Sequence, residues 1–247
     1  MVAGPDPDAP GPLIGRGRAA DVYDVGGGRV LRRYRTDQPC EFEFAVMRAL
    51  RAAGYPVPEV FEVSGPDLVM ERLEGRTMLD VLGSAPWRAG SLARQLADLH
   101  VRLGEVRVER GRSWPRRFAG ADEPLCVAHL DLHPDNVMVT DAGPVVFDWS
   151  NATLAPAGTD VAMTWVLMST SEVDVPRWIR PVAGFVRARF LAEFLAAAGG
   201  LPDRALVHRI VEHRLTDPNV LPAEATRLRE LSARMAANGP IGADSSG

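Results

Sequence analysis

The chain has 247 residues, of which 46% are hydrophobic and 24% are charged, and this composition excludes a disordered or fibrous protein. The 28 basic and 32 acidic residues give a net charge of −4, which excludes the basic surface of a general nucleic-acid binder. Every residue counted as basic is an arginine and none is a lysine, which excludes a Walker-type phosphate loop and a Schiff-base lysine.

A β-rich segment over residues 13–34 is the first element that the sequence predicts. Inside it, Gly26 to Gly28 separate two short runs of valine, leucine and tyrosine, which indicates a hairpin. Apolar residues at helical spacing predict a helix over residues 41–53. Two further strands are predicted at residues 60–63 and 68–70, around a Ser-Gly-Pro turn. We therefore expect a small sheet with one helix.

Beyond residue 74 the pattern becomes mostly helical. Leucines at spacings of four and three residues predict a long helix, and they are Leu92, Leu96, Leu99 and Leu103. Residues 105–124 are polar and aperiodic, which predicts a loop or insertion, and short strands around a loop are predicted within residues 125–139 and 145–147. Four more helices are predicted at residues 160–168, 176–198, 203–215 and 222–237.

These patterns divide the chain near residues 74–76. Both ends are rich in glycine, proline and small residues, which is typical of disordered tails. The predicted organisation is a tail, a β-rich lobe, a helical lobe and a second tail, at residues 1–12, 13–75, 76–238 and 239–247.

The two cysteines, Cys40 and Cys126, lie far apart in the sequence and have no metal-ligand spacing. Isolated thiols are typical of a reducing compartment. The N-terminal residues lack the basic and apolar regions of a signal peptide, and no stretch approaches the roughly 18 apolar residues of a membrane span. We therefore expect a cytoplasmic protein with no membrane partner, whose oligomeric state the sequence leaves open.

One segment has a spacing that is typical of phosphoryl transfer. Asp131 is followed five residues later by Asn136 and twelve residues after that by Asp148, in the runs HLDLHPDN and FDW. The first carboxylate can accept or orient the proton of a substrate hydroxyl. The amide and the second carboxylate can supply the oxygen ligands that Mg²⁺ prefers.

This pattern resembles the catalytic loop of the protein-kinase-like fold, and most closely that of the aminoglycoside phosphotransferase and choline kinase family. The resemblance extends over residues 13–237. It implies an α+β, two-lobed fold, in which a small antiparallel sheet with one main helix precedes a larger, mainly helical lobe. It also implies Asp131 as the catalytic base and Asn136 and Asp148 as the metal ligands.

Two histidines flank the predicted base in this segment. His129 resembles the structural histidine of the catalytic loop. His133 falls where protein kinases often carry a lysine near the transferred phosphate. A phosphate contact and an ordinary loop role both remain open for His133, which we keep as a candidate catalytic residue.

The segment before the hairpin resembles the glycine-rich nucleotide loop of this fold. It reads GRGRAADV from Gly15 to Val22, with Gly17 as its second glycine and Ala20 in place of the third. Glycines let the backbone lie close to phosphates, where N–H groups can face the anion. The resemblance places Val22 over the nucleotide base.

An arginine occupies the strand position at which the resemblance implies a phosphate-binding lysine. Arg32 shares a strand face with Val30, which would face the adenine, and a guanidinium can bridge phosphate oxygens and a carboxylate. Glu43 on the following helix is its expected partner. Arg33 remains an alternative to Arg32, and Glu41 an alternative to Glu43.

The run LVMERLEG over residues 68–75 resembles the hinge that joins the two lobes. By that resemblance, Met70 stands at the entrance of the base pocket. The backbone at Glu71 and Leu73 would form hydrogen bonds with the purine edge. Side-chain identity does not distinguish ATP from GTP at such a site.

Two departures from protein kinases favour a small-molecule acceptor. Leu130 stands where regulated protein kinases carry the arginine that binds a phosphorylated activation loop. Only eleven residues separate Asp148 from Asp160, which leaves little room for a peptide-docking segment. Asp160 itself resembles the aspartate that braces the catalytic loop from the start of a helix.

We therefore predict a kinase that uses Mg²⁺ and either ATP or GTP to phosphorylate a hydroxyl of a small acceptor. The acceptor classes are an aminoglycoside-like antibiotic, an amino alcohol or a sugar. A nucleotide-binding pseudokinase or regulatory module without turnover is the alternative, because the usual lysine and the third glycine are missing.

Overall fold

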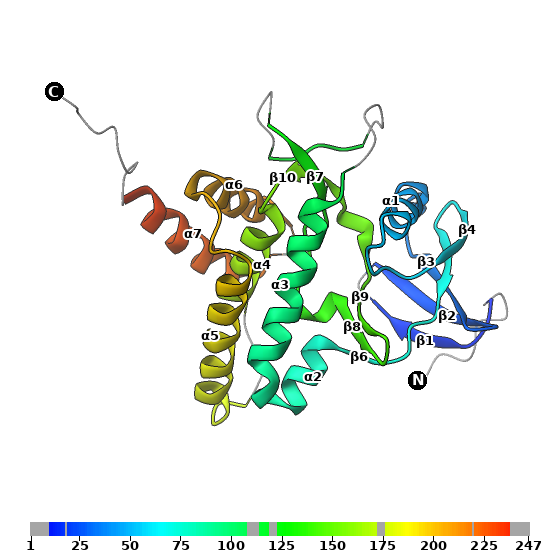
Figure 1. Cartoon of the computed structure of the whole chain (residues 1–247), viewed down its shortest axis with the longest axis horizontal. Helices are drawn as coiled ribbons and strands as arrows, with labels where there is room; N and C mark the ends of the chain where they lie inside the picture. Colours follow the sequence, from blue (N-terminus) through cyan, green and yellow to red (C-terminus); the bar gives the residue numbers. More distant parts are fainter. Residues whose placement is uncertain are drawn as a thin grey trace. The chain divides into compact units, whose positions relative to one another are not determined.

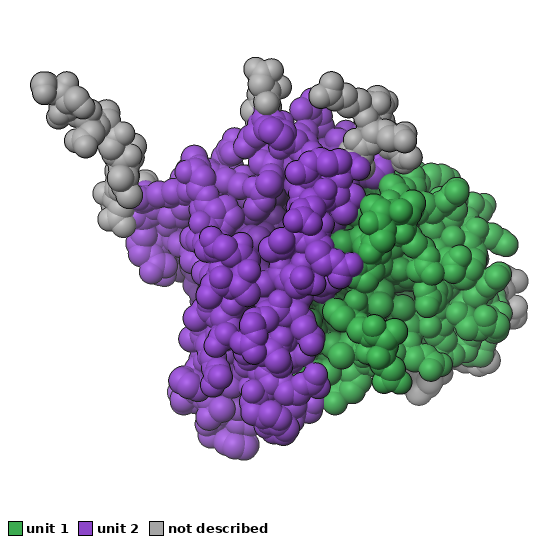
Figure 2. Space-filling model, viewed as in Figure 1, with its two compact units in different colours: residues 1–83, 134–152 green, residues 84–133, 153–247 purple. Residues whose placement is uncertain are grey.

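The computed structural model describes residues 10–17, 19–107, 114–118, 123–171, 176–218 and 220–237. Most of the two predicted tails and ten residues of the predicted loop at 105–124 lie outside these residues. The chain divides into two compact units, residues 1–83 with 134–152 and residues 84–133 with 153–247 (Figure 2). Within the described ranges, no helix combines the length and the apolar character that crossing a membrane requires.

The first unit contains a five-stranded antiparallel sheet in the order β1-β2-β3-β5-β4 (Figure 1). The strands are β1 (Leu13–Arg16), β2 (Ala20–Gly26), β3 (Arg29–Tyr34), β4 (Val60–Ser64) and β5 (Asp67–Glu71). The predicted hairpin is present, because Gly26, Gly27 and Gly28 connect β2 to β3 with φ angles of 77°, 62° and 71°. This left-handed backbone carries no steric cost for glycine.

Helix α1 (Glu41–Ala52) packs against this sheet with its apolar face. Val46, Met47 and Leu50 are fully buried, and the helix contacts β4 and the 3₁₀ turn η3 (Trp149–Asn151). The acidic side chains of its first turn lie at the helix end where negative charge is favourable. The predicted small sheet with one helix is confirmed.

Residues 134–152 belong to the first unit, whereas the sequence pattern placed them in the helical lobe. They form the 3₁₀ turn η2 (Pro134–Asn136), β8 (Val137–Thr140) and β9 (Gly143–Val146), and β8 pairs with the short strand β6 (Arg76–Thr77). Gly75 permits this pairing, since a Cβ at this position would lie 2.3 Å from the carbonyl oxygen of Val139. A sequence pattern does not show which distant strand a hairpin pairs with.

The second unit is mainly helical. Its principal helices are α3 (Ala89–Glu105), α4 (Thr159–Thr170), α5 (Arg180–Ala197), α6 (Arg204–Leu215) and α7 (Pro222–Ala237). The predicted leucine stripe lies on α3 and is fully buried. A second buried cluster joins α4, α6 and α7, and it includes Met163, Val166, Val207, Ile210 and Leu228.

Several short elements were absent from the predicted set. Helix α2 (Met78–Ser84) and the 3₁₀ turn η1 (Pro86–Arg88) precede α3, and strand β10 (Thr153–Pro156) pairs antiparallel with β7 (Leu125–Ala128). All three are too short to show a helical or strand period. The β7–β10 pair matters for function because β7 leads into the predicted catalytic loop.

We expect both cysteine thiols to be unreactive in the folded protein. Burial raises the pKa of Cys40 and that of Cys126 to about 11. At about pH 8, roughly one such thiol in a thousand is ionised, against roughly a quarter of ordinary thiols with a pKa near 8.5. Ellman's reagent should therefore titrate neither cysteine in the native protein and both in concentrated guanidinium chloride. Rapid stoichiometric reaction of the native protein would contradict the burial of these thiols.

Candidate active site

The strand register of the first unit brings the predicted nucleotide-binding side chains to one face of the sheet. Arg32 pairs with Val22 and with Leu68, Val22 pairs with Gly15, and Val30 pairs with Met70. Residues directly opposite each other in antiparallel strands share a face, as do alternate residues along one strand. Gly15, Val22, Val30, Arg32 and Met70 therefore lie on the same face.

The predicted nucleotide loop is the connection between β1 and β2. The Gly17 N–H donates to the Ala20 carbonyl at 2.8 Å, which closes the turn. The guanidinium of Arg35 donates to the Gly17 carbonyl at 2.9 Å and forms an ion pair with Asp21 at 2.6 Å. Arg35 was missed in the sequence analysis because it lies outside the motif, and Arg18 lies outside the described residues.

Arg32 connects two carboxylates that are distant in the sequence. Its Nη1 donates to Glu43 Oε1 at 2.8 Å and its Nη2 donates to Asp148 Oδ1 at 2.7 Å, while only 8% of the residue is exposed. The ring of Tyr34 lies 4.8 Å from the guanidinium carbon. Burial alone would lower the pKa of Arg32, but the two carboxylates raise it overall, so the guanidinium remains charged.

Glu43 is a deeply buried carboxylate with three hydrogen-bond donors. Besides Arg32, it accepts from the Tyr34 hydroxyl at 2.7 Å and from the Trp149 N–H at 3.1 Å. Burial raises the pKa of the Glu43 carboxyl, and these three donors act against that rise. Buried charges persist only with such partners.

The structure distinguishes the alternatives that the sequence left open. Arg33 lies on the other face of β3, and 40% of its side chain is exposed. It forms a bidentate ion pair with Asp67, with N···O distances of 2.8 and 2.7 Å. Glu41 is exposed at the start of α1. The buried pair is therefore Arg32 with Glu43, while its part in nucleotide binding remains a prediction.

The two predicted metal ligands lie at the open end of the β8–β9 hairpin. Val137 pairs with Val146, and the Phe147 N–H donates to the Asn136 carbonyl at 3.1 Å, which places Asn136 and Asp148 on adjoining segments. Asp148 has a left-handed backbone with φ of 65°, and its Oδ1 accepts from both Arg32 and the Ser150 hydroxyl. An amide oxygen and a carboxylate are ligands that Mg²⁺ prefers, so this donor set fits the ion.

The predicted base belongs to the second unit. Asp131 follows β7 and has 34% of its side chain exposed, and the Nε2 of His133 lies 3.3 Å from its Oδ1. The Asp131 N–H donates to Nδ1 of His129, which is fully buried, at 3.2 Å. In the structure, His133 therefore lies beside the carboxylate of Asp131, and the buried His129 ring accepts a hydrogen bond from the loop backbone.

The predicted catalytic loop contains a strained residue, Leu130, whose N–H is bound by a side chain of α4. Leu130 has a φ of 64°, which costs about 1–3 kcal/mol for a residue with a bulky side chain. The two carboxylate oxygens of Asp160 accept the N–H groups of His129 and Leu130 at 2.8 and 2.7 Å, so the expected bracing by Asp160 is present. Burial raises the pKa of Asp160, while its contacts with His129 and Leu130 oppose the rise.

The chain matches the phosphotransferase enzyme family over residues 11–121 and 102–208, which together cover most of its length. The chain belongs to this family. The family resemblance predicted from the catalytic loop is confirmed, and membership makes the protein a phosphotransferase that uses an alcohol group as acceptor. The comparison with curated proteins gives no match.

Solved structures of phosphotransferases share this fold. Aminoglycoside phosphotransferase APH(4)-Ia is 17% identical, with 92% of this chain and 93% of that chain covered and a TM-score of 0.65. A choline/ethanolamine kinase family protein from Mesorhizobium loti is 17% identical over 93% and 88% of the two chains, with a TM-score of 0.50. Amicoumacin kinase hAmiN, in complex with AMP-PNP, Ca²⁺ and Ami, is 14% identical over 95% and 90%, with a TM-score of 0.53. The predicted kinase-like α+β fold is confirmed.

In this phosphotransferase the predicted hinge, residues 68–75, comprises most of β5 and the residues that follow it. The Glu71 N–H donates to the Glu59 carbonyl at 2.8 Å, and the Arg72 N–H donates to the Gly28 carbonyl at 2.9 Å. The Arg72 guanidinium also forms an ion pair with Asp24. Leu73 lies just beyond these contacts, and the hydrogen bonds predicted for the hinge backbone remain a prediction.

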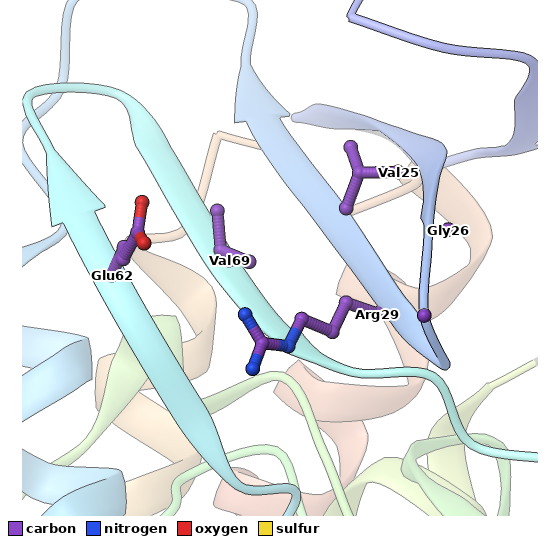
Figure 3. Close-up of a pocket in the computed structure, with 6 residues that line it drawn as sticks. Val25, Gly26, Arg29, Glu62 and Val69 are labelled. Atoms are coloured by element: carbon purple, nitrogen blue, oxygen red, sulfur yellow. The ribbon is translucent and has the colours of Figure 1, made fainter.

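A shallow pocket of about 480 Å³ lies elsewhere on the same sheet (Figure 3). Figure 3 shows Val69 of β5 between Glu62 of β4 and Arg29 of β3, and these two strands lie on either side of β5. Val69 pairs with Leu31, so this pocket opens on the face opposite to Arg32. It is therefore separate from the predicted nucleotide face of the phosphotransferase.

The hydroxyl of Tyr34 was missed by sequence reasoning, and its removal tests the buried network. We expect Tyr34→Phe to lower the free energy of unfolding by about 1–3 kcal/mol, because Glu43 would lose one donor while staying buried. Urea unfolding followed by circular dichroism measures this change.

The matched control is Tyr23→Phe, since Tyr23 is half-buried on the other face of the sheet. Its effect should stay within about 0.5 kcal/mol. Equal effects of the two variants would contradict a special role for the Tyr34 hydroxyl.

Proposed function

We propose that the protein transfers the γ-phosphate of ATP or GTP to a hydroxyl of a small acceptor, with Mg²⁺ as cofactor. The acceptor classes are an aminoglycoside-like antibiotic, an amino alcohol or a sugar. The observation that carries this proposal is the Arg32 bridge between Glu43 and Asp148, because it joins a cation suited to phosphates with a carboxylate suited to a metal.

The donor side of the reaction falls to residues of the first unit. Arg32 binds phosphate oxygens, with Glu43 fixing its orientation, and Gly15 and Gly17 let the loop backbone lie close to the same anion. Val22, Val30 and Met70 line the base, and the backbone at Glu71 and Leu73 binds its edge. The complex of hAmiN with AMP-PNP and Ca²⁺ supports a nucleoside triphosphate and a divalent cation for this fold.

Asn136 and Asp148 are the residues that would hold Mg²⁺. When bound, the ion neutralises the charge that develops on the transferred phosphoryl group. Arg32 and Ser150 keep the Oδ1 of Asp148 in a defined position. Asn136 is held through its own carbonyl by Phe147.

The acceptor side falls to the catalytic loop. Asp131 orients the acceptor hydroxyl and accepts its proton as the oxygen attacks the γ-phosphorus and the bond to the leaving nucleoside diphosphate breaks. His133, 3.3 Å from the Asp131 carboxylate, contributes to binding the phosphate or to holding that carboxylate. A cytoplasmic location without nucleic-acid or membrane partners completes the proposal.

Replacement of the proposed base separates a kinase from a pseudokinase. We expect Asp131→Asn to lower kcat by about 10²–10⁴-fold, because the amide cannot accept the proton, while nucleotide affinity persists. The measurements are nucleotide consumption over a panel of aminoglycosides, amino alcohols and sugars, and thermal stabilisation by nucleotide with Mg²⁺.

Asp135→Asn is the matched control, since Asp135 is exposed in the same segment and should leave turnover unchanged. Wild-type turnover in Asp131→Asn would overturn the assignment of the base. Stabilisation of the wild-type protein by nucleotide without phosphate release over the whole panel would favour the pseudokinase.

The arginine in place of lysine gives a second test. Arg32→Lys keeps the charge but replaces the two nitrogen atoms that contact Glu43 and Asp148 with a single one. We expect kcat/KM for the nucleotide to fall about 10- to 100-fold, as for the loss of one charge-assisted hydrogen bond.

Arg33→Lys is the control on the opposite face of β3 and should leave steady-state kinetics unchanged. If Arg32→Lys matches the wild type and Arg33→Lys does not, the phosphate contact belongs to Arg33.

A further inference from the structure

A buried threonine of α4, Thr164, contacts the backbone of the predicted catalytic loop. The hydroxyl of Thr164 donates to the Leu132 carbonyl at 2.6 Å, and Thr164 and Leu132 are both fully buried. Leu132 directly follows Asp131 in the chain. The proposed assignment of function gives this contact no role.

The same hydroxyl also contacts a buried histidine. Nε2 of His100 lies 3.0 Å from the Thr164 oxygen, and Nδ1 lies 2.7 Å from the Leu96 carbonyl. Burial lowers the pKa of His100 to about 4, so at neutral pH the ring has one N–H. The Leu96 carbonyl can only accept, which places that N–H on Nδ1 and leaves Nε2 as an acceptor. The Thr164 proton thus has two acceptors, and the shorter contact is with Leu132.

Asp131 lies between two points at which α4 holds the loop. On one side, Asp160 accepts the N–H groups of His129 and Leu130. On the other side, Thr164 donates to Leu132. Asp160 and Thr164 are four residues apart, which places them one turn apart on the same face of the helix.

The strain at Leu130 means that contacts on both sides of it stabilise the loop. A left-handed leucine persists only where its surroundings determine its backbone. Asp160 holds the N–H groups before Asp131, and Asp131 itself donates its N–H to His129 Nδ1 and accepts the His133 N–H with its carbonyl at 2.9 Å. The Leu132 carbonyl and the His133 N–H belong to one peptide plane, so the bond from Thr164 also orients the N–H group that holds the Asp131 carbonyl.

We infer that Thr164 is a positioning residue of the phosphoryl transfer: its hydroxyl holds the Leu132 carbonyl and thereby sets the orientation of the Asp131 carboxylate. This inference rests on the proposed role of Asp131. Thr164 touches neither substrate, so its loss affects the chemical step and leaves nucleotide binding unchanged. Small displacements of a positioned group cost up to about 10²-fold in rate.

The test compares Thr164→Val, Thr164→Ser and Thr170→Val. Valine keeps the shape of threonine without the hydroxyl, and serine keeps the hydroxyl. Thr170 is the matched control, because it is buried on the same helix and donates its hydroxyl to the Val166 carbonyl of α4 at 2.8 Å. Steady-state nucleotide consumption gives kcat and KM, and amide hydrogen exchange reports on residues 129–133.

We expect Thr164→Val to lower kcat at least about tenfold with an unchanged KM for nucleotide, and Thr164→Ser to restore most of the activity. Thr170→Val should behave like the wild type. A wild-type kcat in Thr164→Val, or equal losses in Thr164→Val and Thr170→Val, would overturn the inference.

Absence of turnover in the wild-type protein would instead count against the proposed function, and hydrogen exchange then decides the positioning role. Faster exchange at residues 129–133 in Thr164→Val, but not in Thr170→Val, supports the hold on the loop. Unchanged exchange in Thr164→Val overturns it.

Discussion

The buried charge of Arg32 is the constraint around which the first unit is arranged. A guanidinium removed from water is stable only when carboxylates surround it, and here α1 supplies Glu43 while the end of the β8–β9 hairpin supplies Asp148. Burial raises the pKa of Glu43, and the hydrogen bonds from the Tyr34 hydroxyl and the Trp149 N–H oppose that rise. Strand β3, helix α1 and the segment after β9 are therefore held together by one polar network. The same network orients a proposed phosphate ligand and a proposed metal ligand.

In the second unit, the carboxylate of Asp131 lies on a loop in which Leu130 has an unfavourable left-handed backbone conformation. The left-handed Leu130 has its side chain in the core cluster and its N–H on Asp160, so packing and hydrogen bonding together offset the strain. Helix α4 can act as a rigid support because its first turns are buried on nearly all sides. The orientation of Asp131 thus depends on the stability of a helix that need not contact any substrate.

The motif that identifies this phosphotransferase is shared between the two units. Asp131 belongs to the unit with the helical core, whereas Asn136 and Asp148 belong to the unit with the five-stranded sheet. The predicted proton acceptor and the predicted metal ligands are thus each supported by a separate core, although only four residues of chain lie between Asp131 and Asn136. Substitutions in one core are expected to affect one part of the chemistry while sparing the other.

The sequence by itself determined the fold class, the family and the candidate residues Asp131, Asn136 and Asp148, because these depend on local periodicity and on spacing along the chain. It also limited the predicted phosphate contact to two candidates, Arg32 and Arg33. Only the tertiary structure decided which arginine is buried, that Tyr34 and Ser150 support the site, and that residues 134–152 pair with β6. The reason is physical: strand register, burial and hydrogen bonds between distant residues depend on how segments pack, and no local pattern records which segments meet.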